Sequence, residues 1–467
     1  MSASAPTAGA ARVAFGIWLR RAGPFTLLLA ATLVLGLAGQ SVARPVFVLG
    51  SVAVMWDLLR FGASAHYPAS LVLFCLAPIL RRVVDVSVGY DPSGLMISGP
   101  LLGLMVVVPR LLSRIVDGRR LDQALWPFIT AAACVLYATV LTMAGGNLIQ
   151  AASGTLKWIA PLLYGAWLYE EAGRAPGLIR TAARAAMILA PVLGVYGFLQ
   201  YVDPPAWDRF WMTYTSIASI GQPLPYMVRV FSTMNAPAGY ATFTAAALLL
   251  FGFGRARLSL LVAAAPSVLS LMLSTYRTAW IALAIGTVFG LFHRRTVRRA
   301  AMLLIAVPLL AAGVVLFSPA GDALSERLGT FSTVSDDASG MERLGEYAEL
   351  LNTDGGTLIG NGFGNTDVMQ AGAMAQDGQF VVSWYSMGLV VGIVNVASVL
   401  WLAVLAIQRA WRSDTPEGIA VAGIIAGMVV QMPLAVISAS EIGFLFWSLA
   451  AIGAALPPAR PITRGTA

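Results

Sequence analysis

The sequence has little charge, little histidine and little cysteine for its length. Charged residues make up 11% of the 467 residues, whereas an ordinary soluble domain has about a quarter. With 58% hydrophobic residues, this deficit excludes a soluble enzyme and a coiled coil, and it indicates a polytopic helical membrane protein. The two cysteines, Cys75 and Cys134, lie inside apolar runs and predict no disulfide. They form no metal-type cluster with the two histidines, so we expect no metal and no cofactor.

The basic residues outnumber the acidic ones by 30 to 22, and all of them except Lys157 are arginines. A basic excess is also typical of nucleic-acid binding. Here most arginines sit in short segments between apolar runs, as topology signals do. We therefore expect no nucleic-acid partner. The arginine distribution places both chain ends in the cytoplasm and leaves a few arginines outside that orientation does not explain.

Apolar runs long enough to cross a membrane recur along the whole chain. They predict an all-α, polytopic transmembrane helical bundle of about 14 spans. The range 1–457 is interpreted as a single transmembrane domain, followed by a cytoplasmic tail at 458–467. The expected spans are approximately 24–43, 45–60, 67–81, 94–112, 124–144, 155–170, 180–200, 235–254, 258–275, 278–293, 300–317, 380–408, 418–437 and 441–457.

Two outer segments are more than short connectors. The segment 318–379 is a long loop, rich in acids, whose bases are Arg327 and Arg343; a capping box at Ser339–Glu342 predicts an amphipathic helix in it. The glycines of 360–364 predict a tight turn after that helix. The segment 201–234 is rich in aromatic residues, which predicts either an interfacial aromatic belt or a platform for sugar or lipid.

Four outer arginines are candidates for binding an anion. Arg81 and Arg82 end the third run, with Asp85 one turn later, so they form either a surface pair closed by an i,i+4 bridge or part of a site. Arg229 precedes the eighth run. Arg277 lies in a very short hairpin, where an ionised side chain is expected to turn toward a water-filled cavity. Guanidinium groups bind phosphates through paired hydrogen bonds, so these arginines suggest a phosphate-bearing lipid.

Four stretches of the sequence together resemble the superfamily of O-antigen ligases and Wzy-type polysaccharide polymerases. The resemblance covers roughly residues 180–440 and depends on the order, spacing and shared outer placement of the stretches. They are 229–240 (RVFSTMNAPAGY), 274–280 (STYRTAW), 340–343 (GMER) leading into 359–364 (IGNGFG), and Asp377-Gly378 followed after nine residues by Gly388.

The resemblance implies a metal-independent, GT-C-like glycosyltransferase of the bacterial inner membrane, with its active site at the periplasmic face. Its substrate would be an oligosaccharide on undecaprenyl pyrophosphate, held through its pyrophosphate by Arg277, Arg229, Arg81 and Arg82. Ligases carry histidine followed by Asn, Ser or Gln where this chain has Asp377 and Gly378, which favours a polymerase that joins repeat units into an exopolysaccharide, capsule or O-antigen.

In this hypothesis Asp377 is the general base, with Glu346 as the reserve. Arg343 orients the loop helix or contacts the glycan. Expected partners are the lipid-linked oligosaccharide, membrane lipids and a chain-length regulator protein. Two alternatives stay open: a ligase that transfers the glycan to lipid A core or another acceptor, and a flippase for the lipid-linked oligosaccharide.

Overall fold

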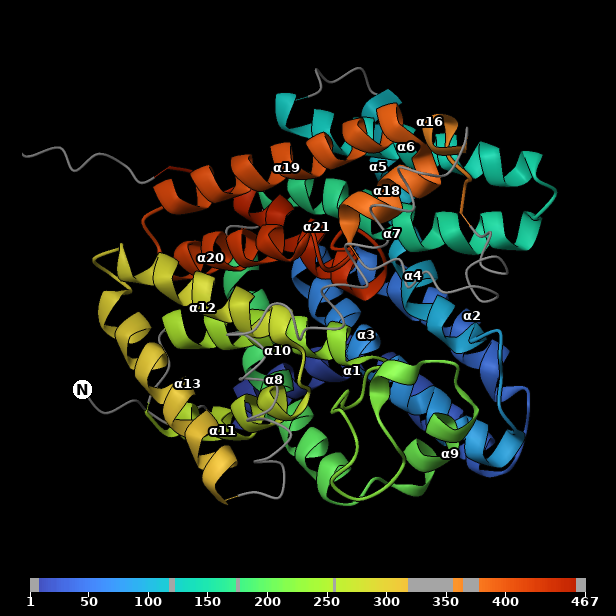
Figure 1. Cartoon of the computed structure of the whole chain (residues 1–467). Helices are drawn as coiled ribbons and strands as arrows, with labels where there is room; N and C mark the ends of the chain where they lie inside the picture. Colours follow the sequence, from blue (N-terminus) through green and yellow to red (C-terminus); the bar gives the residue numbers. More distant parts are fainter. Residues whose placement is uncertain are drawn as a thin grey trace, which may run out of the picture.

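The computed structural model of the protein describes residues 8–116, 122–173, 177–254, 258–317, 356–363 and 378–458. These residues form helices joined by turns and loops, with no β-strand among them, so the all-α prediction is confirmed for this part of the chain (Figure 1). The α-helices are α1 (Ala8–Leu37), α2 (Ala43–Leu58), α3 (Ala63–Val88), α4 (Ser98–Met105), α5 (Val108–Val116), α6 (Trp126–Ala144), α7 (Leu148–Ala172), α8 (Leu178–Val202), α9 (Ala206–Tyr214), α10 (Pro237–Phe253), α11 (Leu258–Leu273), α12 (Arg277–Leu291), α13 (Val297–Phe317), α16 (Gly356–Ile359), α18 (Gln379–Met387), α19 (Leu389–Arg412), α20 (Pro416–Gln431) and α21 (Ser440–Ala454). Short 3-10 helices are η1 (Leu59–Phe61), η2 (Leu95–Ile97), η3 (Gln123–Leu125) and η4 (Ala218–Ile220).

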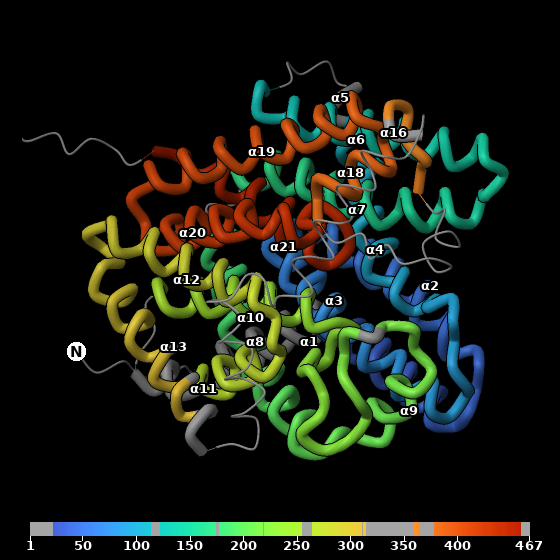
Figure 2. Tube along the Cα trace, in the orientation of Figure 1, coloured from blue at the N-terminus to red at the C-terminus, as the bar shows by residue number. Residues whose placement is uncertain are grey.

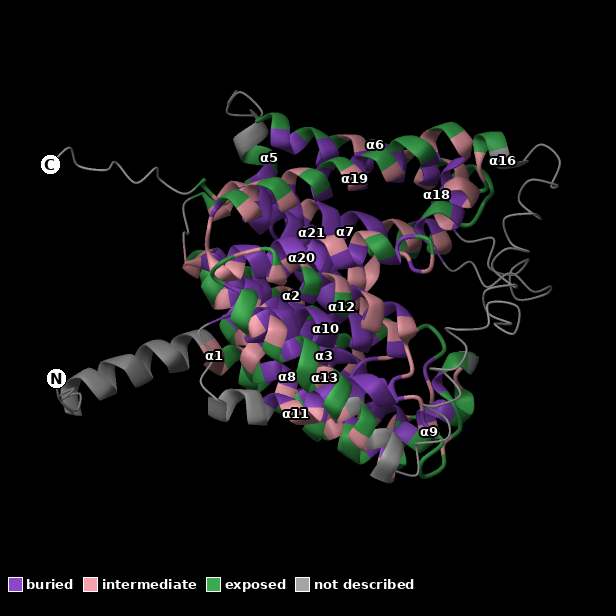
Figure 3. Ribbon diagram, turned by 60° about the vertical axis from the view of Figure 1, so that its left-hand side comes forward, coloured by how far each residue is buried: buried purple, intermediate pink, exposed green. Residues whose placement is uncertain are grey.

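Several of these helices suit a bilayer. In the described part of the chain, 4 helical segments are long and apolar enough to cross a membrane: Leu95–Ser113, Gln123–Ala144, Leu178–Val202 and Leu389–Arg412. Large apolar side chains such as Leu136, Ile188 and Val390 are exposed on α6, α8 and α19, and Figure 3 shows exposed residues along the outer faces of α6 and α19. Lipid tails would cover such faces without cost. These features are consistent with a membrane protein, and the count of about 14 spans stays a prediction.

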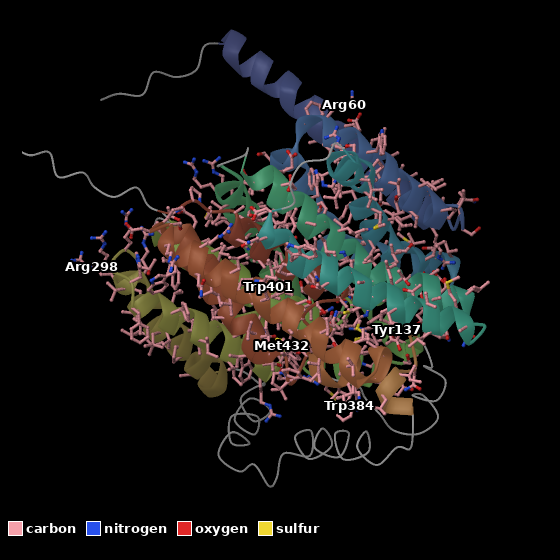
Figure 4. The ribbon with its side chains drawn as sticks, turned by 90° about the horizontal axis from the view of Figure 1, so that it is seen from above. Arg60, Tyr137, Arg298, Trp384, Trp401 and Met432 are labelled. Atoms are coloured by element: carbon pink, nitrogen blue, oxygen red, sulfur yellow. The ribbon has the colours of Figure 1, made fainter. Side chains whose placement is uncertain are left out.

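The bundle has two opposite ends. Figure 3 shows α9, α16 and α18 at one end and α5 at the other. In Figure 4, Tyr137 and Trp384 lie toward the first end, whereas Arg60 and Arg298 lie toward the second. We call the end with α9, α16 and α18 the motif end. Helices α12 and α19 also begin there, next to the stretches 274–280 and 359–364 that suggested a family. We call the end with Arg60 and Arg298 the basic end.

Small residues set the helix packing at the centre of the bundle. Helices α12 and α20 cross where Gly423 and Gly427 of α20 meet Gly286 and Ala282 of α12. A Cβ atom at Gly423 would lie 2.8 Å from the carbonyl oxygen of Gly286, and one at Gly427 would lie 2.6 Å from that of Ala282. Spacing small residues by four lets two backbones approach closely, which is how helices associate in lipid. This contact fixes α12, and so the hairpin from which it begins.

The predicted span at 380–408 is wrong as one continuous helix. The chain breaks at Gly388, whose φ is +78°, and forms the short helix α18 before it and the long helix α19 after it. The two helices fold back on each other, and a Cβ atom at Gly392 would lie 2.7 Å from the carbonyl oxygen of Ser383. Glycine is required at such a break because a side chain is disfavoured at positive φ. The candidate membrane span therefore begins at Leu389.

Candidate functional site

The hairpin between α11 and α12 presents Arg277 at the motif end. Thr275 adopts a φ of +50°, and α12 begins two residues later at Arg277. The indole nitrogen of Trp280 donates a hydrogen bond of 3.2 Å to the carbonyl oxygen of Leu271, which closes the hairpin. The helix dipole makes the N-terminus of a helix partially positive, so this position normally favours an anion and disfavours a cation such as Arg277. Arg277 and the first N–H groups of α12 therefore present positive charge at one place, as an anion site requires.

Arg229 lies against the same hairpin. Its Nε atom donates a hydrogen bond of 2.7 Å to Thr275 Oγ1. One residue later, the N–H of Val230 donates 3.2 Å to the carbonyl oxygen of Leu273. Both arginines are half-buried. The structure thus brings together Arg229 and the turn that carries Arg277, which come from two of the four stretches that suggested a family.

Arg82 lies in a different environment at the same end. Its side chain is 0% exposed, as is that of Asp208, and its Nε atom lies 3.2 Å from Asp208 Oδ1. Its Nη2 atom donates 2.7 Å to the carbonyl oxygen of Ser232. The guanidinium carbon lies 4.9 Å from the ring centroid of Phe231 and 5.9 Å from that of Trp211. Arg82 is therefore enclosed by protein, with no exposed surface for a phosphate.

The carboxylate of Asp208 is held by a buried polar network. Its Oδ2 atom accepts hydrogen bonds from Tyr196 at 2.9 Å and from Gln200 at 2.7 Å. The Oε1 atom of Gln200 accepts the N–H groups of Phe231 and Ser232 at 3.1 and 2.8 Å. We name Arg82, Asp208 and Gln200 the brace. The brace fixes the segment that follows Arg229, so its role is to position that arginine.

Arg81 is also paired within the protein. Its Nε atom lies 3.3 Å from Asp85 Oδ2, which is the i,i+4 bridge that was one of the two alternatives from the sequence. Its Nη2 atom donates to the carbonyl oxygen of Asp91, and its guanidinium carbon lies 5.6 Å from the ring centroid of Tyr90. Arg44 of α2 reaches Asp85 as well, at 2.9 Å. Arg81 is 6% exposed, so like Arg82 it connects structural elements at this end.

The glycine-rich turn at 360–363 packs against the break between α18 and α19. Gly362 has a φ of +74°, and its N–H donates 2.9 Å to the carbonyl oxygen of Ser386. The N–H of Phe363 donates 2.6 Å to Thr142 Oγ1 on α6. A Cβ atom at Gly360 would lie 2.3 Å from the backbone nitrogen of Gly388. The segment makes these contacts in an irregular conformation, so the tight turn predicted here stays a prediction. The contacts join two of the four stretches.

Gln379 anchors the start of α18. Its Oε1 atom accepts the N–H groups of Ile437 and Ser438 at 3.1 and 3.2 Å, and its side chain is buried. Gly378, one residue earlier, has a φ of +116° and lies against the carbonyl oxygen of Pro433. The candidate base Asp377 directly precedes this anchor and lies outside the described residues. Arg343, Glu346 and the expected amphipathic helix also lie outside them.

Sequence reasoning missed two charged residues, Glu441 and Lys157. Both line a cavity of about 50 Å³, with Asn235 and Ser440 beside them. That volume fits a water molecule. A Cβ atom at Gly239 would lie 2.9 Å from Glu441 Oε1, so the glycine of the 229–240 stretch leaves room for this carboxylate. An acid inside an apolar run and the chain's one lysine were the signals that could have pointed to this cavity.

Asn235 completes the lining of this cavity. Its Oδ1 atom is buried and has no hydrogen-bond partner among the residues that the structure describes. Ser440 has a φ of +55°, an unusual conformation that a side chain adopts only at some cost. The segment 432–441 therefore connects the anchor of α18 to Glu441, and through Gly239 to the stretch that carries Arg229.

The aromatic segment at 201–234 contains both buried and exposed rings. Figure 2 shows it as α9 and the long irregular chain that leads to α10. Trp211 is 1% exposed and Tyr201 6%, so both belong to the protein interior. Tyr214 and Tyr226 are exposed. Trp211 is buried where α9 packs on α3, with the guanidinium of Arg82 over its ring.

The arrangement at the motif end places Arg229 against the hairpin from which α12 begins with Arg277. No group of three or more His, Cys, Asp or Glu residues that could hold a metal ion occurs among the described residues. No family model matches the chain, and no curated protein matches it.

Proposed function

We propose that the chain is a glycosyltransferase that joins undecaprenyl-pyrophosphate-linked oligosaccharide repeat units at the periplasmic face of a bacterial inner membrane. It would thereby build a polysaccharide. The observation that carries the proposal is the contact of Arg229 with Thr275 in the hairpin from which α12 begins. It supports a pyrophosphate site because two guanidinium-bearing segments and a helix N-terminus meet at one place.

In the proposed reaction, the donor is the growing chain on its lipid pyrophosphate. A sugar hydroxyl of a new lipid-linked unit attacks the anomeric carbon of the donor. The bond from that carbon to the pyrophosphate oxygen breaks, and the hydroxyl proton passes to a carboxylate. The lipid pyrophosphate leaves with the bonding electron pair, and Arg229 and Arg277 stabilise its developing charge. The brace keeps Arg229 in place and does not touch the substrate.

Asp377 is the proposed base. It directly precedes Gly378 and Gln379, which are anchored to the segment 432–438. Glu441 is the second candidate, because it lies three residues beyond that segment and lines a cavity with Lys157. A base must come within hydrogen-bond reach of the attacking hydroxyl. The roles of the two carboxylates can be distinguished by comparing Asp377→Asn with Glu441→Gln.

The test is synthesis by the full purified chain in vesicles that contain lipid-linked single repeat units. Products are separated by gel and weighed by mass spectrometry. We expect a ladder whose steps equal one repeat unit. Transfer of one unit to added lipid A core without a ladder would instead identify a ligase. Movement of the lipid-linked unit across the bilayer without a new glycosidic bond would identify a flippase.

A further inference from the structure

An apolar groove lies between α12 and α19 at the basic end, opposite the proposed site. Its volume is about 680 Å³, which is within the range of pockets that bind ligands, roughly 300–1,000 Å³. Its lining includes Val288 and Phe289 from the end of α12, Phe292 directly after it, and Trp411 and Arg412 from the end of α19. Phe292 is 78% exposed. The groove is therefore open along an apolar side and ends at a cationic residue.

A charged cluster of His293, Arg294, Arg295 and Asp414 lies next to the end of this groove. Arg294 and Arg295 donate hydrogen bonds of 3.2 and 2.6 Å to Asp414 Oδ2. His293 Nε2 lies 3.1 Å from Asp414 Oδ1. The ring centroid of His293 lies 5.3 Å from that of Trp411, so the cluster is continuous with the groove lining.

The charges of this cluster do not cancel. Arg294 and Arg295 share the one carboxylate of Asp414, and Arg412 adds a further positive charge at the groove itself. An orientation signal would explain arginines at this end. It would not explain an open apolar groove that ends among them.

We propose that the groove binds one anionic phospholipid, with an acyl chain along Val288, Phe289 and Phe292 and the phosphate at Arg412 and Arg295. The apolar lining requires a tail, which a free phosphate lacks. The excess positive charge favours an anionic over a zwitterionic headgroup. Trp411 would lie at the level of the headgroups, where tryptophan is enriched in membrane proteins. The proposal does not depend on the reaction at the motif end.

Quenching of Trp411 by brominated lipid tests this proposal. The full chain is placed in nanodiscs that contain one brominated lipid, either anionic phosphatidylglycerol or zwitterionic phosphatidylcholine, at equal mole fraction. Subtracting the emission of a Trp411→Phe variant isolates the signal of Trp411. We expect the anionic lipid to quench Trp411 more strongly than the zwitterionic lipid does. Equal quenching by the two lipids would overturn the proposal.

The variant Arg412→Gln provides the second part of this test. Removing one basic residue near a membrane surface should lower the enrichment of the anionic lipid at the groove, measured by the quenching of Trp411, by roughly fivefold. Arg60→Gln is the matched control, since Arg60 is exposed, lies at the same end and does not line the groove. An Arg412→Gln protein with unchanged quenching would refute the assignment.

A second copy of the chain is the other possible occupant of the groove. If neither lipid quenches Trp411 and native mass spectrometry shows a dimer, a second copy covers the groove and the lipid proposal is wrong.

Discussion

Arg82 and Arg277 lie at the same end of the bundle and carry the same guanidinium group, but their surroundings differ. Arg82 is fully enclosed, paired with the buried carboxylate of Asp208 and covered by two aromatic rings. Arg277 is half-buried at the beginning of a helix, next to a turn that also receives Arg229. The first environment leaves no room for a ligand, and the second suits an anion. The comparison separates an arginine that holds the fold from one that can meet a substrate.

The largest expected effect comes from breaking the brace. Asp208→Asn would leave the charge of Arg82 buried without its counter-charge, which typically costs about 3–5 kcal/mol. We expect a much lower thermal midpoint of the purified protein and little of it in membranes. Asp203→Asn is the matched control, because Asp203 pairs with Arg209 in an exposed position nearby, where a pair contributes about 1 kcal/mol or less. If the Asp208→Asn protein is stable but makes no polymer, Asp208 takes part in the reaction and does more than stabilise the fold.

The next largest effect concerns the base. Asp377→Asn keeps the shape of the side chain but cannot accept a proton, and loss of a general base costs on the order of 100- to 10,000-fold in rate. We expect lipid-linked single units to accumulate in cells while the protein still reaches the membrane. Glu441→Gln is made in parallel. If Glu441→Gln abolishes synthesis and Asp377→Asn does not, the base is Glu441 and the assignment of Asp377 is wrong.

A smaller effect is expected at Thr275. Thr275→Val keeps the size of the side chain but removes the hydroxyl that accepts from Arg229 at 2.7 Å. A hydrogen bond to a charged group contributes about 1.5–3 kcal/mol. We expect roughly a tenfold or greater fall in turnover, since 1.4 kcal/mol corresponds to tenfold, and a modest fall in thermal midpoint because the same bond also holds two segments of the fold together. Unchanged turnover would mean that the position of Arg229 against the hairpin does not matter for activity.

The smallest effect is the pH dependence of the surface cluster around Asp414. Partial burial raises the pKa of Asp414, but the hydrogen bonds and charges of Arg294 and Arg295 outweigh it and hold the pKa below its ordinary value. The cluster therefore stabilises the fold above the pKa of the unfolded chain, about 3.9, and this contribution is lost as the pH falls through the folded pKa. We expect Asp414→Asn to lower the thermal midpoint slightly at pH 6, by an amount that disappears in strong acid. A difference that grew toward acid pH would contradict this sign.

The sequence allowed the general architecture and part of the site to be predicted. Apolar run lengths indicated the helices. The glycines at 360 and 362 marked an irregular segment, and both adopt the positive φ that favours glycine. The short hairpin at Arg277 was also identifiable, since a charged residue between two apolar runs needs a reason to be there.

The remaining features depend on contacts between distant segments. Nothing near Arg82 in the sequence indicates Asp208, which reaches it through the packing of α9 on α3. The pairing of Arg44 with Asp85 across α2 and α3 is equally non-local. His66 of α3 is fully buried, and its Nδ1 atom lies 3.0 Å from the hydroxyl of Tyr164 on α7. Periodicity identifies a helix but not the neighbour on each of its faces.

The most direct test of the central claim is the turnover of Arg277→Lys on lipid-linked repeat units in vesicles. Lysine keeps the positive charge but lacks the planar fork that grips a pyrophosphate with paired hydrogen bonds. Arg209→Lys is the control, because Arg209 is an exposed arginine on α9 at the same end. We predict that Arg277→Lys loses most of its activity while its thermal midpoint stays that of the wild type and the Arg209→Lys protein makes a normal ladder. A wild-type ladder from Arg277→Lys would contradict the account, since Arg277 would then serve only to anchor the beginning of α12.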